Sequence, residues 1–323
     1  MYLQILCTAL TFCLQSSADT VYVNQHSRNT LPLKQSSAST TLVELAYPTY
    51  QPRTPRKPRI HAEVGRYRLR LAENVVDRDA ACRLRFRVFN IELNEGLASS
   101  YQTGMDSDQF DLFCDHLLVE DKTEANPARR VVGTYRMQSG ATAQRNLGYY
   151  SEQEFNFASY EPLRESILEL GRASIDREHR TPEVLTLLWR GIAQYANDMG
   201  LRYLIGCSSL TSKDPAEGWQ VYRQLEAYCV SPEFMTEPTA AYACPIEQVS
   251  LQTQLPSQSE DVSSQPAQGK VPKLLKTYLA IGARLCAPPA WDRDFGTIDF
   301  LTLLDLKMIS QAARNRFLAP VNT

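Results

Sequence analysis

The stretch from residue 167 to residue 210 constrains the fold of this 323-residue chain more than any other. It begins with ILELGRASID, continues with RTPEVLTLLWRGIAQYANDMG and ends with LRYLIGCSSL. The first and last runs are short and apolar, as buried strands are, while the middle run repeats apolar residues every three or four positions, as a helix does. A strand, a helix and a strand in succession form a crossover, so the two strands are predicted to be parallel neighbours in one sheet.

The crossover helix carries recognisable end signals. Thr181 has the side chain of an N-cap, Pro182 suits the first helical position, and Gly200 is typical of a helix C-terminus. A second helix is predicted over residues 77–95, with Asp77 as its N-cap. Its expected buried face holds four apolar residues, Ala81, Leu84, Val88 and Ile91.

The remaining segments predict an α+β fold. CDHLLVED and RRVVGTYRMQ have strand character, and the turn-rich KTEANPAR between them predicts a hairpin. After the crossover, a C-terminal segment contains the helical pattern KLLKTYLAIGARL, the strand pattern FLTLLDL and the helical pattern KMISQAARNRFL. The expected organisation is a disordered or extended arm (1–60), a core (61–249), a linker or loop (250–272) and a C-terminal extension packed on the core (273–323).

Composition and charge exclude several classes of protein. A net charge of −2 argues against a dedicated nucleic-acid binder. The eight cysteines are scattered singly and the four histidines lie far apart, so no metal site is expected; reduced thiols favour a cytoplasmic protein. The first eighteen residues have an apolar centre but no Lys or Arg before Arg28, so they lack the basic start of a secretory signal, and they are too short and polar for a membrane span. A genuine N-terminus, a signal-like segment and a mis-assigned start codon all stay open.

Residues 51–90 contain eleven Arg and Lys against four Asp and Glu. This surplus has two interpretations, a solvated arm or a surface that contacts an anionic membrane or an acidic partner. The second interpretation predicts peripheral contact with the inner membrane.

Glu169 and Arg172 lie inside the apolar run that opens the crossover. Residues three apart point to opposite faces of a regular strand. A β-bulge at Gly171 would turn both side chains toward one side. The pair is therefore either a buried ion pair or part of a site.

Two other signals favour structural roles. His116 and Asp121 have the His-x4-Asp spacing of glycerol-phosphate acyltransferases, but HLLVED reads as a strand and not as the loop that this motif requires. Trp291 and Asp292, in PPAWDRDF, are most simply explained as loop anchors.

Several motifs occur in an order that resembles a known family. LRFRVF, DSDQFDLFCDHLLV, VVGTYRM and LELGRASID follow one another as in the acyl-homoserine-lactone synthases. RTPEVLTLLWRGIAQYA, YLIGCSSL and GARLCAPPAWDRDFGTIDFLTLLDL resemble their relatives, the ornithine N-acyltransferases, often labelled hemolysin-like. The resemblance spans residues 66 to 318. It implies a GNAT-like fold, with a mostly antiparallel sheet and a parallel strand pair, 167–176 and 203–210, that splays apart to admit an acyl-pantetheine arm.

The resemblance also implies a set of site residues, position by position. The first helical region supplies Arg85 and Phe89, the Asp-x-aromatic-Asp motif supplies Asp108 and Asp111, and the hairpin strand supplies Arg136. Glu169 is the first choice for the base that accepts the amine proton, with Asp108 or Asp111 second. Binding of an amino-acid carboxylate suits an arginine, and three residues compete for that role: Arg172, Arg136 and Arg85.

The loop before the crossover helix departs from the acetyl-CoA-using GNAT enzymes. It reads DREHRTPE and lacks their glycine-rich phosphate cradle. This favours the acyl-phosphopantetheine of acyl carrier protein as donor, with no cofactor bound by the enzyme itself. Arg177, His179 and Arg180 either contact the carrier or form an exposed basic turn.

The resemblance thus predicts transfer of a long acyl chain, with or without a 3-hydroxyl group, to the α-amine of ornithine, giving a lyso-ornithine lipid. Two alternatives stay open. The first is an N-acyl amino acid synthase that uses another acceptor. The second is a non-catalytic module of the same fold that binds a carrier protein or a membrane.

Overall fold

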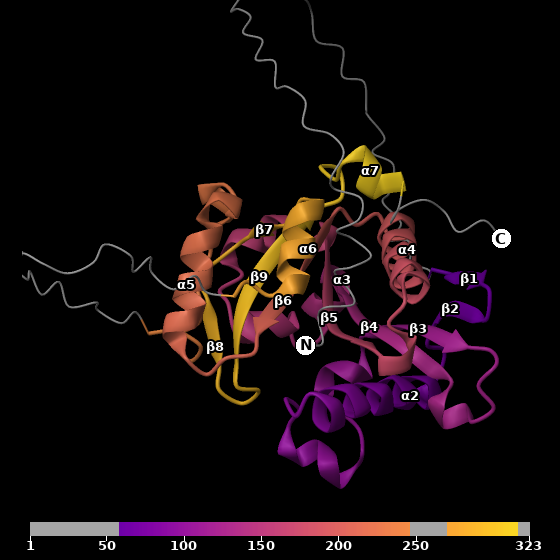
Figure 1. The fold of residues 1–323 in the computed structure, drawn as a ribbon. Coiled ribbons are helices and arrows are strands. Elements are labelled where there is room, and N and C mark those ends of the chain that lie inside the picture. The colour runs from indigo at the N-terminus through magenta and orange to yellow at the C-terminus, as the bar shows by residue number, and fades with distance from the viewer. Residues whose placement is uncertain (1–57, 246–269, 316–323) are drawn as a thin grey trace, which may run out of the picture.

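The computed structural model describes residues 58–245 and 270–315. These residues contain a nine-stranded sheet with helices on both sides (Figure 1). The helices are α2 (Val75–Phe86), α3 (Gly140–Arg145), α4 (Pro182–Asp198), α5 (Pro215–Leu225), α6 (Lys273–Ile281) and α7 (Gln311–Ala313). The strands are β1 (His61–Val64), β2 (Tyr67–Leu71), β3 (Asp115–Asp121), β4 (Val131–Ser139), β5 (Ile167–Ile175), β6 (Tyr203–Leu210), β7 (Arg284–Leu285), β8 (Ala290–Asp292) and β9 (Thr297–Asp305).

The strand order is β1-β2-β3-β4-β5-β6-β9-β7, and β8 pairs with β9. Among these paired strands β5 and β6 alone run parallel, and the other pairs are antiparallel. The predicted mixed sheet, with one parallel pair joined by a crossover helix, is therefore confirmed.

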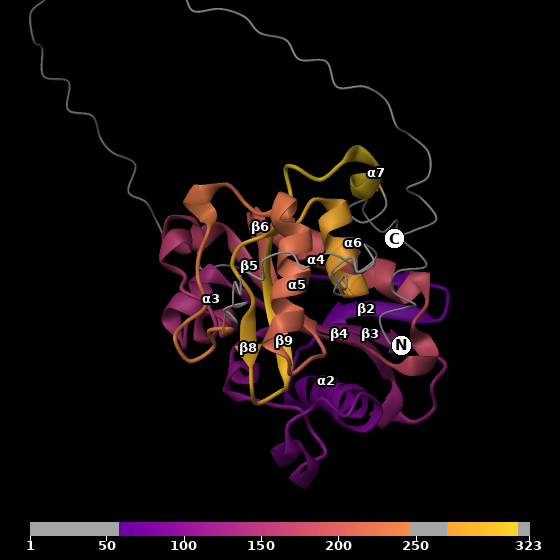
Figure 2. The same ribbon diagram turned by 60° about the vertical axis from the view of Figure 1, so that its left-hand side comes forward.

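The C-terminal segment continues the same sheet. β9 pairs with the whole length of β6, from Tyr203 opposite Asp305 to Leu210 opposite Ile298. Figure 2 shows β9 beside β6, with β8 next to β9. This segment thus supplies strands next to the parallel pair, where they help to form the site.

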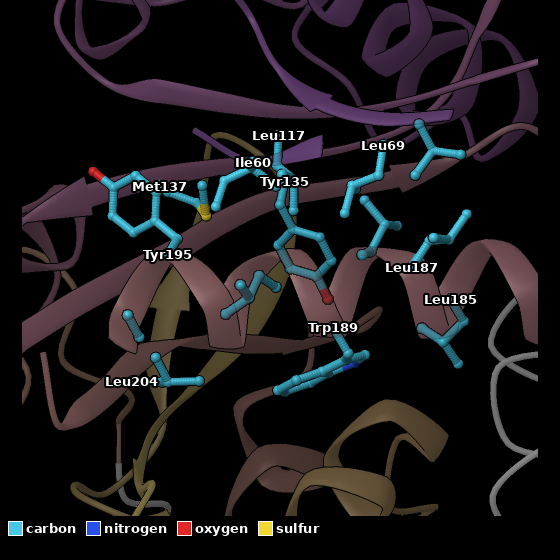
Figure 3. Close-up of a cluster of buried hydrophobic side chains, with 14 of the residues drawn as sticks. Ile60, Leu69, Leu117, Tyr135, Met137, Leu185, Leu187, Trp189, Tyr195 and Leu204 are labelled. Atoms are coloured by element: carbon cyan, nitrogen blue, oxygen red, sulfur yellow. The ribbon is translucent and has the colours of Figure 1, made fainter. Parts of the chain in front are cut away.

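Helix α4 forms much of the core on one side of the sheet. Thr181 caps its N-terminus as predicted, because its side chain accepts a hydrogen bond from the N–H of Val184. Its apolar stripe packs on residues of β2, β3 and β4 that point to the same face (Figure 3). Helix α2 covers the opposite face through a smaller cluster that includes Leu84 and Leu118.

Two predicted helices differ from those observed. The first ends at Phe86 and begins after Asn74, whose side chain accepts from the N–H of Asp77, so Asp77 is not the N-cap. A π-helical turn follows (Arg87–Glu92), and because it changes the helical period, the predicted core residue Ile91 is 62% exposed. In the C-terminal segment the helix stops at Ile281, because Gly282 adopts a left-handed conformation, and the next residues enter β7.

The final helix predicted over residues 307–318 is short in the described part, where α7 spans Gln311–Ala313. The predicted arm falls almost entirely on residues 1–57, and the predicted linker mostly on residues 246–269, both outside the described residues. No helix in the described ranges is long and apolar enough to cross a membrane.

Candidate active site

A cavity of about 290 Å³ opens where the two parallel strands separate. The ladder between β5 and β6 ends at Glu169 and Ile205, although both strands continue beyond these residues. Gly206 lies at this point, and a Cβ there would come within 2.3 Å of the carbonyl oxygen of Leu170. A residue without a side chain is therefore required where the strands part.

The cavity reaches both sides of the sheet. Leu185 of α4 and Leu274 of α6 contribute from one side, and Phe89 and Tyr150 contribute from the other. The predicted gap between splayed strands is therefore present. Much of its lining is apolar, which suits the alkyl chain of an acyl group.

A β-bulge on β5 brings the two charged residues of the Glu-x-x-Arg motif together. The β4–β5 register shifts between Thr134 and Arg136, which face Ser174 and Gly171. Arg172 has a left-handed backbone with a φ of 50°, so the positive φ falls one residue after the glycine. The bulge turns Arg172 toward the side on which Glu169 lies, and both side chains contact Tyr150.

Glu169 is held in a fixed position by backbone donors. Its two carboxylate oxygens accept hydrogen bonds from the N–H groups of Tyr150 and Ser151, each at 2.8 Å. These donors begin a 3₁₀ helix (Tyr150–Gln153). The side chain is 5% exposed and borders the cavity, and burial raises its pKa despite the two donors.

Two of the three candidate arginines are neutralised by aspartates. Arg85 is fully buried and bonds to Asp106 at 2.7 Å and to both oxygens of Asp111 at 2.7 and 2.9 Å. Arg136 bonds to both oxygens of Asp108 at 2.7 and 2.8 Å. The Arg85 guanidinium holds the pKa of the Asp111 carboxyl well below its usual range, although burial opposes this.

These contacts place the predicted aspartates in an ionic cluster and not in the cavity. Asp111 lies in the ionic cluster behind the cavity wall, and Asp108 also caps the short helix Gln109–Leu112. Asp106, which the sequence reasoning did not single out, is an equal member of this cluster. The sequence pattern could have indicated Asp106, because it lies two residues before Asp108 in DSDQFD.

Arg172 differs from the other two arginines. Its closest carboxylate contacts are long, 3.9 Å to Asp106 and 3.6 Å to Asp108. In the described part of the chain its Nε has no hydrogen-bond partner. The guanidinium lies over the rings of Tyr150 and Phe295 and borders the cavity. Of the three arginines, Arg172 is thus the best placed to contact a ligand.

The predicted carrier-binding residues occupy different environments. Arg177 is exposed. The Nδ1 atom of His179 lies 3.1 Å from the Tyr67 hydroxyl and 3.2 Å from Arg66. Arg180 has a side chain only 6% exposed and forms a bidentate ion pair with Glu92 at 3.0 and 2.7 Å, so Glu92 offsets its charge.

The N-terminus of α4 has few donors left for a phosphate. The N–H of Thr181 bonds to the carbonyl of His179, Pro182 has no N–H, and the N–H of Val184 bonds to the capping hydroxyl. Glu183 adds a negative charge in the first turn. These contacts leave the first turn of α4 with few free N–H donors for a pyrophosphate.

Four further residues border the cavity that the sequence reasoning did not assign to the site: Glu154, Cys207, Asp292 and Asp299. Asp292 does anchor its loop, because it accepts hydrogen bonds from the N–H groups of Asp294 and Phe295, but it also faces the cavity. His116 is buried at the ionic cluster, and burial lowers its pKa to about 4. It does not border the cavity.

The splayed parallel pair, the bulge and the cavity between the strands together define an acyltransferase of the GNAT class. The sequence profile of the acetyltransferase (GNAT) domain matches residues 84–190.

Two curated relatives narrow this class. An L-ornithine N(alpha)-acyltransferase of Agrobacterium fabrum (strain C58) is 31% identical over 258 residues, which cover 78% of this chain and 85% of the relative. That of Brucella abortus (strain 2308) is 31% identical over 271 residues, covering 80% and 93%. This chain belongs to the L-ornithine N(alpha)-acyltransferase family. Among solved structures, the AHL synthase LasI aligns with 80% of this chain and 97% of its own, at 11% identity and a TM-score of 0.44.

Proposed function

We propose that this chain transfers a long acyl group from acyl carrier protein to the α-amine of L-ornithine and so produces a lyso-ornithine lipid. The observation that carries this proposal is the cavity between β5 and β6, which Glu169 and Arg172 border on one side and apolar residues on the other. The names of the curated relatives support ornithine as the acceptor.

In this mechanism Glu169 accepts a proton from the α-ammonium, directly or through water. The raised pKa of the carboxyl favours this role, since a base works best when its pKa approaches the working pH. The neutral amine then attacks the thioester carbonyl and forms a tetrahedral intermediate, and the thiol leaves with a proton.

The oxyanion of that intermediate needs fixed donors. The β5–β6 ladder ends at Glu169, and the bulge follows, so backbone N–H groups of this part of β5 are candidates to supply them. Arg172 is assigned to the acceptor carboxylate, because its guanidinium is not locked into short carboxylate bonds. Arg85, Arg136, Asp108 and Asp111 then hold the wall that positions these groups.

The donor is assigned to acyl carrier protein on the strength of the α4 N-terminus. A pantetheine arm carries one phosphate, whereas coenzyme A carries a pyrophosphate that would need more donors than this helix offers. Arg177 is the exposed residue of the loop that suits an acidic carrier surface. Contact of the basic N-terminal arm with an anionic membrane also stays a prediction.

The test is an acyl-transfer assay with purified full-length chain, L-ornithine and donors of one acyl length, read by mass spectrometry. We expect acyl-ornithine to form, with a higher kcat/KM for acyl carrier protein than for acyl-CoA. Equal use of both donors would contradict the donor assignment. Acylation of a different amino acid, with none of ornithine, would replace this function by that of an N-acyl amino acid synthase.

A further inference from the structure

Three carboxyl groups from distant parts of the chain meet in the wall of the cavity. Glu154 follows the 3₁₀ helix Tyr150–Gln153, Asp292 ends β8 and Asp299 lies on β9. One oxygen of each lies within 4.8 Å of the others, and the side chains are only 3–5% exposed. We refer to Glu154, Asp292 and Asp299 as the acidic triad.

The acidic triad has no ion-pair partner in the described part of the chain, although Arg172 acts on Asp299 at longer range. Within residues 58–245 and 270–315, no Lys, Arg or His forms an ion pair with any of the three. Asp299 is 4% exposed, and its Oδ1 atom has no hydrogen-bond partner among the described residues. A buried polar atom without a partner is costly, so this atom and its neighbours are arranged for a ligand.

A primary ammonium suits this arrangement better than a divalent metal ion does. An ammonium group has three N–H donors and no acceptor, and the acidic triad offers three carboxyl acceptors around one point. Magnesium and calcium need six or more oxygen ligands, whereas the neighbouring group here is the thiol of Cys207, 3.6 Å from Glu154.

The acidic triad also lies at a suitable distance from the reaction centre. The 3₁₀ helix that holds Glu169 through the N–H of Ser151 ends at Gln153, and Glu154, its C-cap residue, comes three residues after Ser151. Three residues of a 3₁₀ helix rise about 6 Å, which is close to the span of a short methylene chain. The Cys207 thiol touches both the Ser151 hydroxyl and Glu154, each at 3.6 Å, and so bridges the two positions.

We propose that the acidic triad binds the side-chain ammonium of a diamino-acid acceptor and thereby selects such acceptors over neutral amino acids. This inference rests on the proposed function, because it assigns the α-amine to Glu169 and the carboxylate to Arg172. The pKa shifts of Glu154 and Asp299 agree with it. Burial and the neighbouring carboxylates raise the pKa of Glu154 and bring that of Asp299 to about 6, as expected for a cluster that awaits a cation.

The experiment compares two acceptors that differ only in the terminal amine, L-ornithine and L-norvaline, with the same acyl donor. We expect the native chain to prefer ornithine in kcat/KM by roughly 10- to 100-fold, the worth of a charged hydrogen-bonded contact. Asp299→Asn should bring that ratio close to one. The matched control Asp294→Asn, an exposed residue of the same hairpin, should keep the native ratio.

Calorimetric titration of L-ornithine into the donor-free chain gives an independent measurement. Ornithine binding that weakens at least tenfold in Asp299→Asn supports the inference, even if no acceptor is acylated and the proposed function fails. Acylation of ornithine and norvaline with equal efficiency would overturn the inference and leave the acyltransferase function intact.

Two further outcomes are decisive. If Asp299→Asn does not fold, Glu154→Gln is measured in its place with the same expectation. If EDTA abolishes ornithine binding and Mg²⁺ restores it, the acidic triad is a metal site and the inference is wrong.

Discussion

Replacement of Glu169 by glutamine tests the proposed base and has a structural cost that can be worked out. Both carboxylate oxygens accept a backbone N–H, from Tyr150 and from Ser151. A glutamine amide has one oxygen, so its NH₂ group must face one of these donors. One buried N–H then loses its partner, which costs about 1–3 kcal/mol of unfolding free energy.

The expected loss of activity is larger than this loss of stability can explain. Removal of a general base lowers kcat by roughly 10²-fold or more. When the free energy of unfolding falls by about 1–3 kcal/mol, almost all molecules of a domain of ordinary stability are still native. Urea unfolding followed by circular dichroism and a thioester-turnover assay on the same preparation separate the two effects.

Glu120→Gln is the matched control. Glu120 is 4% exposed, lies on β3 away from the cavity, and bonds to Arg68 at 2.8 Å and Arg70 at 2.7 Å. The Glu120→Gln variant should have a lower free energy of unfolding and an unchanged kcat. If Glu169→Gln retains kcat within threefold of the native chain, or if Glu120→Gln loses kcat equally, Glu169 is not the base.

Two further predictions concern the donor and the acidic triad. Arg177→Glu should raise KM for acyl carrier protein by about three- to tenfold and leave kcat nearly unchanged. The control is Arg145→Glu, at an exposed arginine on α3, which should change neither constant. An unaltered KM in Arg177→Glu would refute the docking assignment. Without acceptor, Asp299→Asn should stabilise the chain above pH 6, because burial and the neighbouring Asp292 raise the pKa of Asp299 from 3.8 to about 6, with Ser209, Thr297 and Arg172 opposing. The native state then binds more protons than the unfolded state between these values, so native stability falls as pH rises from about 4 to 6 and the advantage of the variant grows. Thermal melts at pH 4.5 and 7.5 measure this, and an advantage that shrinks with pH would contradict it.

The sequence by itself determined the local elements and their order. The 3.6-residue period and the caps of α4 depend only on residues close together in the sequence. A strand, a helix and a strand in succession normally form a right-handed crossover between two parallel strands of one sheet. The two charged residues in ILELGRASID also indicated an ion pair or a site, because burying a Glu and an Arg in a strand is costly unless they have partners. The 3.6-residue period predicted the wrong buried face at the π-helical turn, where Ile91 is exposed.

The tertiary structure alone decided which charges remain available. Arg85, Arg136 and Arg172 look equivalent in the sequence, and only their surroundings show that two are neutralised by short bonds to aspartates while Arg172 has only long carboxylate contacts. Glu154 and Asp299 lie 145 positions apart, and they meet because β9 pairs with β6 next to the gap between the parallel strands. Local patterns specify helices and strands, but which side chains meet depends on strand register and strand order, and these are set by packing of the whole chain.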